Sequence, residues 1–301
     1  MSTDAAEPAM QLDHDDRMYR YFRNAVERHW DPYEIDLDED RETLMAFDFE
    51  EGEEDFDYFR QGLALFGAGE EAVTEDLAPL ATVSESIEDE MFVTTQMYEE
   101  AKHTEFFDRY WREVVRPVAD EKGYERASPL DDRYFMDDYD ALFESNDRAM
   151  KRLLTDDTPE NRVRAHAHYH LVIEGILAQT GYYSFNTNFG EQYPELPHLP
   201  GLVEGFGQIR SDEGRHVGFG MAKLKQYVQG GVDVDVLTDT VNDLVQLTQG
   251  IVMESTDPEG PGMDRDELIQ FSVDKHSQRM EQITDASSDI PSVEELTRLA
   301  D

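Results

Sequence analysis

The sequence predicts an all-α protein built around a four-helix bundle, and three observations support that prediction. Long stretches place apolar residues three and four positions apart, which is the spacing of one helix face. No stretch of useful length alternates apolar and polar residues as a half-buried strand would. The pattern Glu-x-x-His occurs twice, at 100–103 and at 213–216. Residues three apart lie on one side of a helix, so each pair can point toward a single place.

Eight helices are expected in chain order. A first helix over 16–29 is followed by Trp30-Asp31-Pro32 and an acidic connector as far as residue 54. Helices over 55–83 and from Ser84 or Ser86 to 118 come next, because either serine can cap a helix start. A connector rich in Pro, Asp and Gly at 117–135 precedes helices over 136–155 and 159–185.

The second half continues in the same way. Residues 186–200 contain Asn, Gly and three prolines and are expected to form a loop. A helix over 201–228 ends at Gly230-Gly231, and helices over 234–254 and 264–284 flank a Pro/Gly loop at 257–262. We expect residues 1–15 to be disordered, 16–285 to form one helical domain and 286–301 to be a polar tail.

Composition excludes several classes of function. The 301 residues include no cysteine, so disulfides, thiolate ligands and a cysteine nucleophile are excluded. A net charge of −43 argues against nucleic acid or an anionic membrane as a partner. The acidic residues are spread along the whole chain, and salt screens the repulsion between them. Such a surface suits a salt-rich cytoplasm, so we expect a halophilic source. The acidic N-terminus is unlike a secretory signal, and no apolar run is long enough for membrane insertion, so a cytoplasmic location is expected.

Carboxylates on apolar helix faces are the main indication of function. Glu70 lies on the apolar stripe of 55–83, Glu100 and His103 lie on the stripe of the next helix, and Glu99 is expected to fall off it. Buried carboxylates are costly unless they are paired or bound to cations. Two divalent ions would balance four glutamates, and an oxygen-rich set with one histidine per metal suits iron or manganese better than zinc. The expected ligands are Glu70, Glu100, His103, Glu174, Glu213 and His216.

Simpler explanations exist for each part of this pattern. One Glu-x-x-His is common in an acidic helical protein, and one buried Glu is more often a paired core group. His170 lies four residues before Glu174 on the same face, so it is either a direct ligand or, as we expect, a hydrogen-bonding neighbour of the ligands. Glycines that gather near the expected ligands indicate either close helix packing or room for a bound molecule.

The order Glu, Glu-x-x-His, Glu, Glu-x-x-His resembles the ferritin-like superfamily, and within it the small subunit of class I ribonucleotide reductase, over roughly 20–230. Trp30 and Asp212 resemble that group's near-N-terminal Trp and the Asp that links it to the metal site. Two features depart from the radical-carrying reductases. Phe107 stands where they carry the radical Tyr, and no Tyr follows Tyr227, although their C-terminal tail has one.

Gly69 to Thr74, Glu99 to Thr104 and Tyr169 to Gly175 are more similar to the ligand-binding oxidases of the same superfamily. That resemblance implies a heterodinuclear Mn/Fe centre (alternatively Fe/Fe), a long-chain fatty acid bound at it, O₂-dependent oxidation and a homodimer. It also implies an ether crosslink between Val73 and Tyr169. One metal would take Glu70, Glu100 and His103, and the other Glu174, Glu213 and His216, with bridging carboxylates between them.

The crosslink assignment makes a structural demand. In a regular α-helix, side chains five apart, such as Tyr169 and Glu174, diverge, so both reach one site only if the helix carries a π-bulge near 169–175. Three other functions remain open: a ribonucleotide reductase small subunit, a non-enzymatic metal- or lipid-binding protein, and a component of an arene or alkene monooxygenase.

Overall fold

The computed structural model describes residues 12–258 and 260–298. Within these ranges the chain consists of helices and loops and contains no strand, as expected for an all-α ferritin-like bundle. The long elements are α1 (Arg17–Glu27), α3 (Glu53–Asp76), α5 (Ile87–Tyr110), α7 (Asp137–Leu153), α8 (Pro159–His166), η4 (Ala167–Ala178), α9 (Gln179–Asn188), α10 (Pro200–Gln229), α11 (Val234–Glu254) and α12 (Arg265–Thr284).

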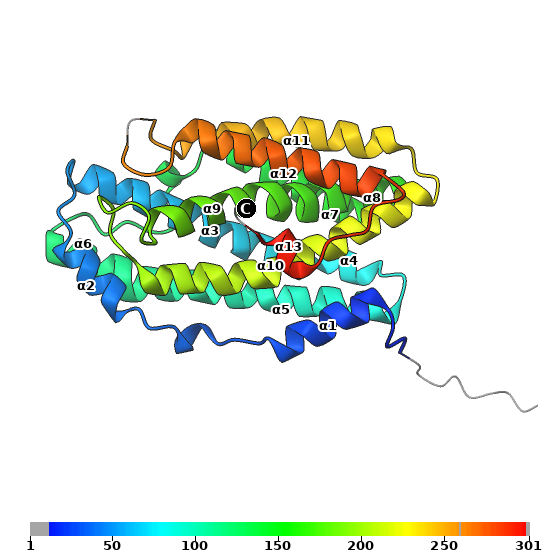
Figure 1. Ribbon diagram of the computed structural model, residues 1–301, viewed down its shortest axis with the longest axis horizontal. Coiled ribbons are helices and arrows are strands. Elements are labelled where there is room, and N and C mark those ends of the chain that lie inside the picture. Colours follow the sequence, from blue (N-terminus) through cyan, green and yellow to red (C-terminus); the bar gives the residue numbers. More distant parts are fainter. Residues whose placement is uncertain (1–11, 259, 299–301) are drawn as a thin grey trace, which may run out of the picture.

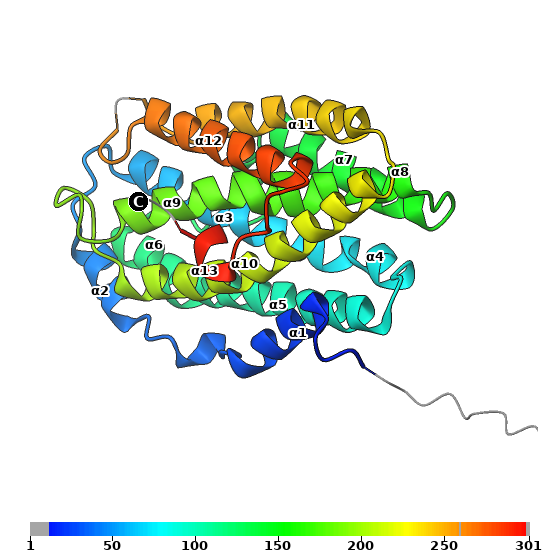
Figure 2. The same cartoon turned by 45° about the vertical axis from the view of Figure 1, so that its right-hand side comes forward.

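The centre of the bundle is formed by α3, α5, α10 and the continuous rod of α8, η4 and α9. Helix α5 packs against α3, and α10 packs against η4. Helix α1 runs along the outer side of α5, while α11 and α12 cover η4 from the opposite side of the molecule (Figures 1 and 2). The four central rods are therefore shielded by other helices, and their facing sides form the core.

Local sequence signals set where helices start and stop. Ser86 is the N-cap of α5 and its hydroxyl accepts the N–H of Asp89, which decides between the two expected capping serines. Helix α10 ends at Gly230, and Gly231 follows with a φ of 104°, a conformation that other residues avoid. The 55–83 stretch, expected as one helix, is two, because Pro79 lies in the first turn of α4 (Ala78–Thr82) and interrupts the hydrogen-bond ladder.

Three segments expected to be irregular contain helices, so these predictions were wrong in part. Helix α2 (Asp38–Ala46) and the short η1 (Pro32–Glu34) lie in the acidic connector. The π-helical η2 (Trp111–Val115) joins α5 to α6 (Arg116–Lys122), which runs past the expected helix end at 118 into the connector at 117–135. The short η3 (Asp132–Tyr134) lies in the same connector. Helix α13 (Val293–Leu296) lies in the polar tail and packs on α10 with Leu296 buried. In each of these three segments a few side chains are buried against the bundle.

The expectation of disorder at the N-terminus falls mostly outside the described residues, since it concerns 1–15 and the description starts at 12. The part that is described lies against the bundle. The backbone N–H of Asp13 donates to Glu88 Oε1 of α5 at 2.7 Å.

Glycines near the bundle centre allow aromatic rings to approach the backbone. A Cβ on Gly181 of α9 would lie 2.4 Å from the ring of Phe66 on α3, and a Cβ on Gly62 of α3 would lie 2.5 Å from the ring of Phe185 on α9. Each helix therefore places a ring where the other has no side chain. At these positions the glycines serve close packing.

Charge is distributed unevenly between the interior and the surface. Among the described residues nine acidic side chains are buried: Asp40, Glu70, Glu88, Asp89, Glu99, Glu100, Glu174, Asp212 and Glu213. Seven basic side chains are buried as well: Arg60, Lys102, Arg109, Arg215, Lys223, Lys225 and Arg279. The formal charge of these buried groups is seven minus nine, or −2, of the −43 carried by the whole chain. Within the described part, no helix combines the length and apolar character that crossing a membrane requires.

Candidate metal centre

Four rods bring six side chains into one buried cluster. Glu70 comes from α3, Glu100 and His103 from α5, Glu174 from η4, and Glu213 and His216 from α10. None is more than 7% exposed. Two groups of four have ligand atoms within 4.8 Å of one another: Glu70, Glu100, His103 and Glu213 in one, and Glu100, Glu174, Glu213 and His216 in the other. Glu100 and Glu213 belong to both groups, which is the arrangement of two neighbouring sites that share bridging carboxylates.

Four buried atoms of this cluster lack hydrogen-bond partners. His103 Nδ1 lies 3.3 Å from Glu100 Oε2, and His216 Nδ1 lies 3.1 Å from Glu100 Oε1, yet neither nitrogen makes a hydrogen bond. Glu174 Oε2 and Glu213 Oε2 are likewise buried without a partner. Buried polar atoms without partners are costly. A pair of divalent cations fits this set of nitrogen and carboxylate donors.

The other ring nitrogen of each histidine is held by a carboxylate. Asp212 Oδ2 lies 3.1 Å from His103 Nε2, and Glu99 Oε2 lies 2.9 Å from His216 Nε2. Arg215 Nη2 joins the two carboxylates, with 2.5 Å to Glu99 Oε1 and 2.5 Å to Asp212 Oδ1. A carboxylate that accepts from Nε2–H fixes the ring and its tautomer and leaves Nδ1 free to bind a metal.

Two further donors reach Asp212. Trp30 Nε1 and Lys102 Nζ each donate to Asp212 Oδ2 at 2.8 Å. The Trp30 ring also stacks on the His103 ring, with centroids 6.2 Å apart. The link from Trp30 through Asp212 to His103, which the resemblance implied, is therefore present.

The expectation for Glu99 was wrong. It was placed off the apolar stripe, but its side chain is only 2% exposed and holds His216. Helices α1, α3 and α10 pack against α5 and leave it a narrow exposed stripe that includes Thr94, Tyr98 and Glu105, and Glu99 lies outside that stripe. Lys102, Arg215 and Gln96 were missed as well. The basic residues next to the motif histidines, rare in so acidic a chain, were the signal that could have identified this network.

Burial and neighbouring charges perturb the ionisation of the cluster. Burial raises the pKa of Glu70, Glu174 and Glu213 above the usual range. Burial acts the same way on Glu100, but the adjacent His216 and His103 lower its pKa well below that range. Without cations, these carboxylates compete for protons, whereas bound cations would let all of them stay ionised.

The expected distortion is confirmed. Residues Ala167–Ala178 form the π-helix η4, whose hydrogen bonds run from i to i+5 and so bring residues five apart to one face. Tyr169 consequently points into the cluster together with Glu174, and its hydroxyl donates to Glu100 Oε1 at 2.7 Å. Tyr169 is fully buried and Val73 is 4% exposed.

His170 does not form a hydrogen bond with any of the six clustered side chains. Its Nε2 lies 3.2 Å from Gln96 Oε1, and Gln96 Nε2 donates to Glu174 Oε1 at 2.9 Å. His170 therefore acts on Glu174 through Gln96, in agreement with the expectation that it is a hydrogen-bonding neighbour.

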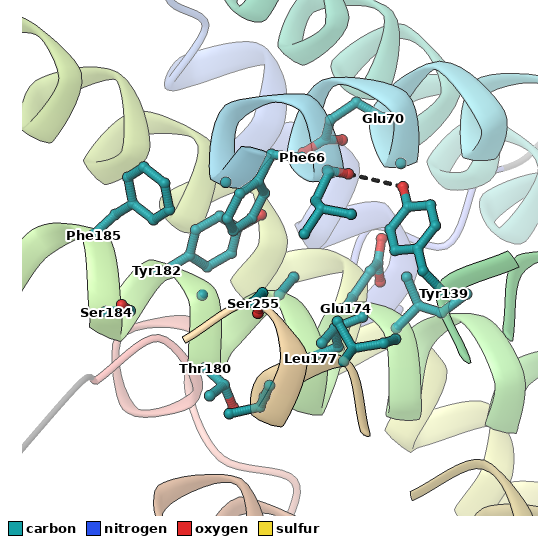
Figure 3. Close-up of a pocket in the computed structure, with 18 of the residues that line it drawn as sticks. Phe66, Glu70, Tyr139, Glu174, Leu177, Thr180, Tyr182, Ser184, Phe185 and Ser255 are labelled. Carbon is teal, nitrogen blue, oxygen red and sulfur yellow. Dashed lines mark hydrogen bonds between the residues drawn. The ribbon is translucent and has the colours of Figure 1, made fainter. Parts of the chain in front are cut away.

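A cavity of about 140 Å³ adjoins the cluster. Glu70, Glu100, Glu174 and Glu213 line its inner end together with Val73 and Tyr169, and most of the remaining wall is apolar. In Figure 3 Glu70 and Glu174 lie at one end, and Phe185 and Ser184 lie at the other. Tyr139 stands beside the inner end with its hydroxyl turned to the Leu65 carbonyl, to which it donates at 2.8 Å (Figure 3).

Comparisons with known proteins agree with this geometry. Solved structures of an R2-like ligand-binding oxidase superpose with a TM-score of 0.78 at 29% sequence identity, covering 91% of this chain and 95% of theirs. One is a Tyr-to-Phe variant and another a Val-to-Leu variant, with Mn/Fe cofactors reconstituted in air and without air, respectively. A Gly-to-Leu variant of the same oxidase carries a non-activated Mn/Mn cofactor. Residues 11–283 match the family described as "Ribonucleotide reductase, small chain". This chain therefore belongs to the ribonucleotide reductase small-chain family, and its structural neighbours include that family's Mn/Fe ligand-binding oxidases.

Proposed function

We propose that this protein is an O₂-dependent oxidase with a dinuclear Mn/Fe centre that binds an apolar carboxylate beside the metals and forms an ether crosslink between Val73 and Tyr169. The observation that carries the proposal is the juxtaposition of two four-residue ligand groups with a cavity lined by both crosslink residues. An Fe/Fe centre would use the same ligands. The similarity to Mn/Fe oxidases supports the heterodinuclear form.

The proposed ligand roles follow the two groups. Glu70 and His103 would hold one metal, and Glu174 and His216 would hold the other, while Glu100 and Glu213, which belong to both groups, would be shared between them. Asp212 and Glu99 keep the two histidines in the tautomer that leaves Nδ1 available. Most of the cavity wall beyond the ligand carboxylates is apolar, which suits an apolar ligand.

Tyr169 and Val73 supply the two atoms of the ether bond. Crosslinking removes one hydrogen from Val73 Cβ and one from the Tyr169 phenol, which releases two protons and two electrons. The Tyr169 hydroxyl donates a hydrogen bond to Glu100 Oε1, which holds the phenol oxygen at the inner end of the cavity. Bound Mn(II) and Fe(II) would supply two further electrons, so that one O₂ is reduced to two waters with two additional protons from solvent.

The cavity indicates how much of a ligand it encloses. Its volume of about 140 Å³ is close to the ~150 Å³ of an engineered apolar cavity that holds benzene. A long-chain fatty acid with its carboxylate toward the metals would therefore have only its first carbons enclosed. The remainder would leave past the outer end, which is lined by Ser184 and Phe185 (Figure 3).

Mass spectrometry of protein reconstituted with Mn(II), Fe(II) and air tests this function, with metals quantified alongside. We expect two metals per chain and the loss of two hydrogens, mapped to peptides that contain Val73 and Tyr169. The Tyr169→Phe variant should bind both metals and show no mass loss. Full metal loading of the wild-type protein without a crosslink would refute the crosslinking activity.

A reductase small subunit is the second candidate, because the matched family is that of the ribonucleotide reductase small chain. Phe107 replaces the radical Tyr and packs, 5% exposed, against Phe66 and Phe206, which favours the oxidase. Support of nucleotide reduction when the protein is mixed with a reductase large subunit would favour this second function. We also propose a homodimer and a salt-rich cytoplasm as the setting. Sedimentation at high salt tests the first of these.

A further inference from the structure

Three polar side chains outside the ligand set form a hydrogen-bonded chain that ends on Glu174. His166 Nδ1 lies 3.2 Å from His170 Nδ1, His170 Nε2 lies 3.2 Å from Gln96 Oε1, and Gln96 Nε2 donates to Glu174 Oε1 at 2.9 Å. Gln96 and His170 are fully buried, and His166 is 3% exposed. No step proposed above uses any of the three.

These hydrogen bonds allow one consistent set of proton positions on Gln96, His170 and His166. Glu174 accepts, so the Gln96 amide turns its NH₂ toward Glu174 and its oxygen toward His170. His170 must then carry its proton on Nε2, which leaves its Nδ1 as an acceptor for the Nδ1–H of His166. Burial lowers the pKa of both imidazoles, that of His166 to about 3, in keeping with two neutral rings. The two histidines thus hold the Gln96 amide in one orientation.

The two ends of the metal cluster differ because of this chain. Glu174 Oε1 accepts from Gln96 and lies 3.2 Å from His216 Nδ1, so this carboxylate is tied down next to His216. The corresponding carboxylate is that of Glu70, and among the described residues no side-chain amide or hydroxyl donates to it. It lies 3.4 Å from His103 Nδ1 and lines the cavity. One terminal carboxylate is therefore fixed, and the other can change its position.

Gly220 on helix α10 leaves the space that His170 occupies. A Cβ on Gly220 would lie 2.1 Å from His170 Cβ and 2.5 Å from its Cγ. The three atoms nearest to that Cβ all belong to His170, so Gly220→Ala would displace His170 first. Gly220 belongs to the glycine cluster that the sequence left unexplained.

We propose that Gln96, oriented by His170 and His166, is a positioning residue that holds Glu174 beside His216 and makes the His216 metal position the rigid one of the pair. The Glu70 position is the adaptable one. This inference rests on the proposed function only in taking Glu174 and Glu70 as metal ligands. A polar partner behind a metal ligand commonly contributes about 10–100-fold in metal affinity.

Anaerobic calorimetric titration of the chelator-stripped protein with Mn(II) alone tests the proposal. The wild-type chain should bind two Mn(II), and Gln96→Leu should weaken one of the two binding steps by about 10–100-fold while leaving the other within about threefold. Repeating the comparison in a Glu70→Gln background, which disables the other position, assigns the weakened step to the His216 position. Gly220→Ala should weaken the same step by a smaller factor.

Gln179→Leu is the matched control, because Gln179 is fully buried on the rod that carries His170 and Glu174 and neither of its amide atoms has a hydrogen-bond partner. It should leave both steps unchanged. Equal Mn(II) affinities in Gln96→Leu and wild type, or equal weakening by Gln96→Leu and Gln179→Leu, would overturn the positioning role. Failure of the wild-type chain to bind Mn(II) would instead overturn the proposed function, so the two failures are distinguishable.

Discussion

Arg215 is the residue whose loss should most affect the stability of the metal-free protein. Its guanidinium is fully buried and joins Glu99 to Asp212, each at 2.5 Å. Replacing it by Met removes the charge and keeps much of the volume. Asp212 would retain Lys102 at 2.8 Å, whereas Glu99 would keep only His216. The change is therefore equivalent to breaking one buried pair, for which the expected loss in unfolding free energy is about 3–5 kcal/mol.

Denaturant titration of Arg215→Met and wild type, both stripped with chelator and at equal high salt, measures this loss. Arg23→Met is the control, since Arg23 pairs with Glu27 on the surface of α1 at 44% side-chain exposure. That variant should lose less than about 1 kcal/mol. If Arg215→Met cost no more than the control, the bridge between the two histidine-holding carboxylates would not be a stabilising unit and the reasoning would fail.

Three further predictions concern packing, pH and salt. Gly205→Ala should lower the free energy of unfolding by about 1–3 kcal/mol, because the new Cβ would lie 2.0 Å from the Phe106 ring. Gly207→Ala, whose Cβ would have no atom within 4 Å, should stabilise α10 by up to about 1 kcal/mol. Thermal unfolding compares the two variants. Burial lowers the pKa of His166 from 6.5 to about 3, so below pH 6.5 the unfolded chain gains a proton that the folded one does not. The free energy of unfolding of the metal-free protein should therefore fall as pH decreases. His166→Phe should reduce the slope of this free energy against pH by up to about 1.4 kcal/mol per pH unit between pH 6.5 and about 4.5, measured by denaturant titration. With its charge of −43 screened, the protein should unfold at higher temperature in molar KCl than in dilute buffer, and an optimum in dilute buffer would contradict the halophilic assignment.

Much of the bundle could be predicted from sequence because its helices are long and their apolar spacing extends over many turns. The π-helix was predictable for a different reason, since two side chains five apart, Tyr169 and Glu174, were expected at one place. Helices α2 and α13 were missed because each buries so little, Asp40 and Leu44 in the first and Leu296 in the second. Windows of 11 or more residues do not detect such segments.

The six clustered side chains could be identified from spacing, and Trp30, Asp212 and His170 behind them from resemblance and spacing, but Glu99, Gln96 and the contacts of Arg215 were missed. Glu99 lies on a side of α5 that a one-face model leaves to solvent, and only the packing of α1 and α10 shows that it is buried. Gln96 lies on the stripe itself, four residues before Glu100, but its partners His170 and Glu174 come from another helix. Arg215 is separated from Glu99 by 116 positions, so their contact depends on how α5 and α10 pair. Patterns within one helix carry no information about such contacts.

The near-neutral interior has a consequence for how this chain meets other molecules. Since the buried groups account for only −2 of the −43 charges, the acidic excess belongs to the outside, where it holds a layer of mobile cations. The negative surfaces of two copies of the chain repel each other, and their two layers of cations must be compressed or released before the surfaces touch. We therefore expect the rate of self-association to rise with ionic strength, the reverse of proteins that attract their partners by opposite charge, and stopped-flow light scattering across a KCl series would measure it. A small apolar carboxylate faces the same field on its way to the cavity, so its capture should also speed up as salt is added.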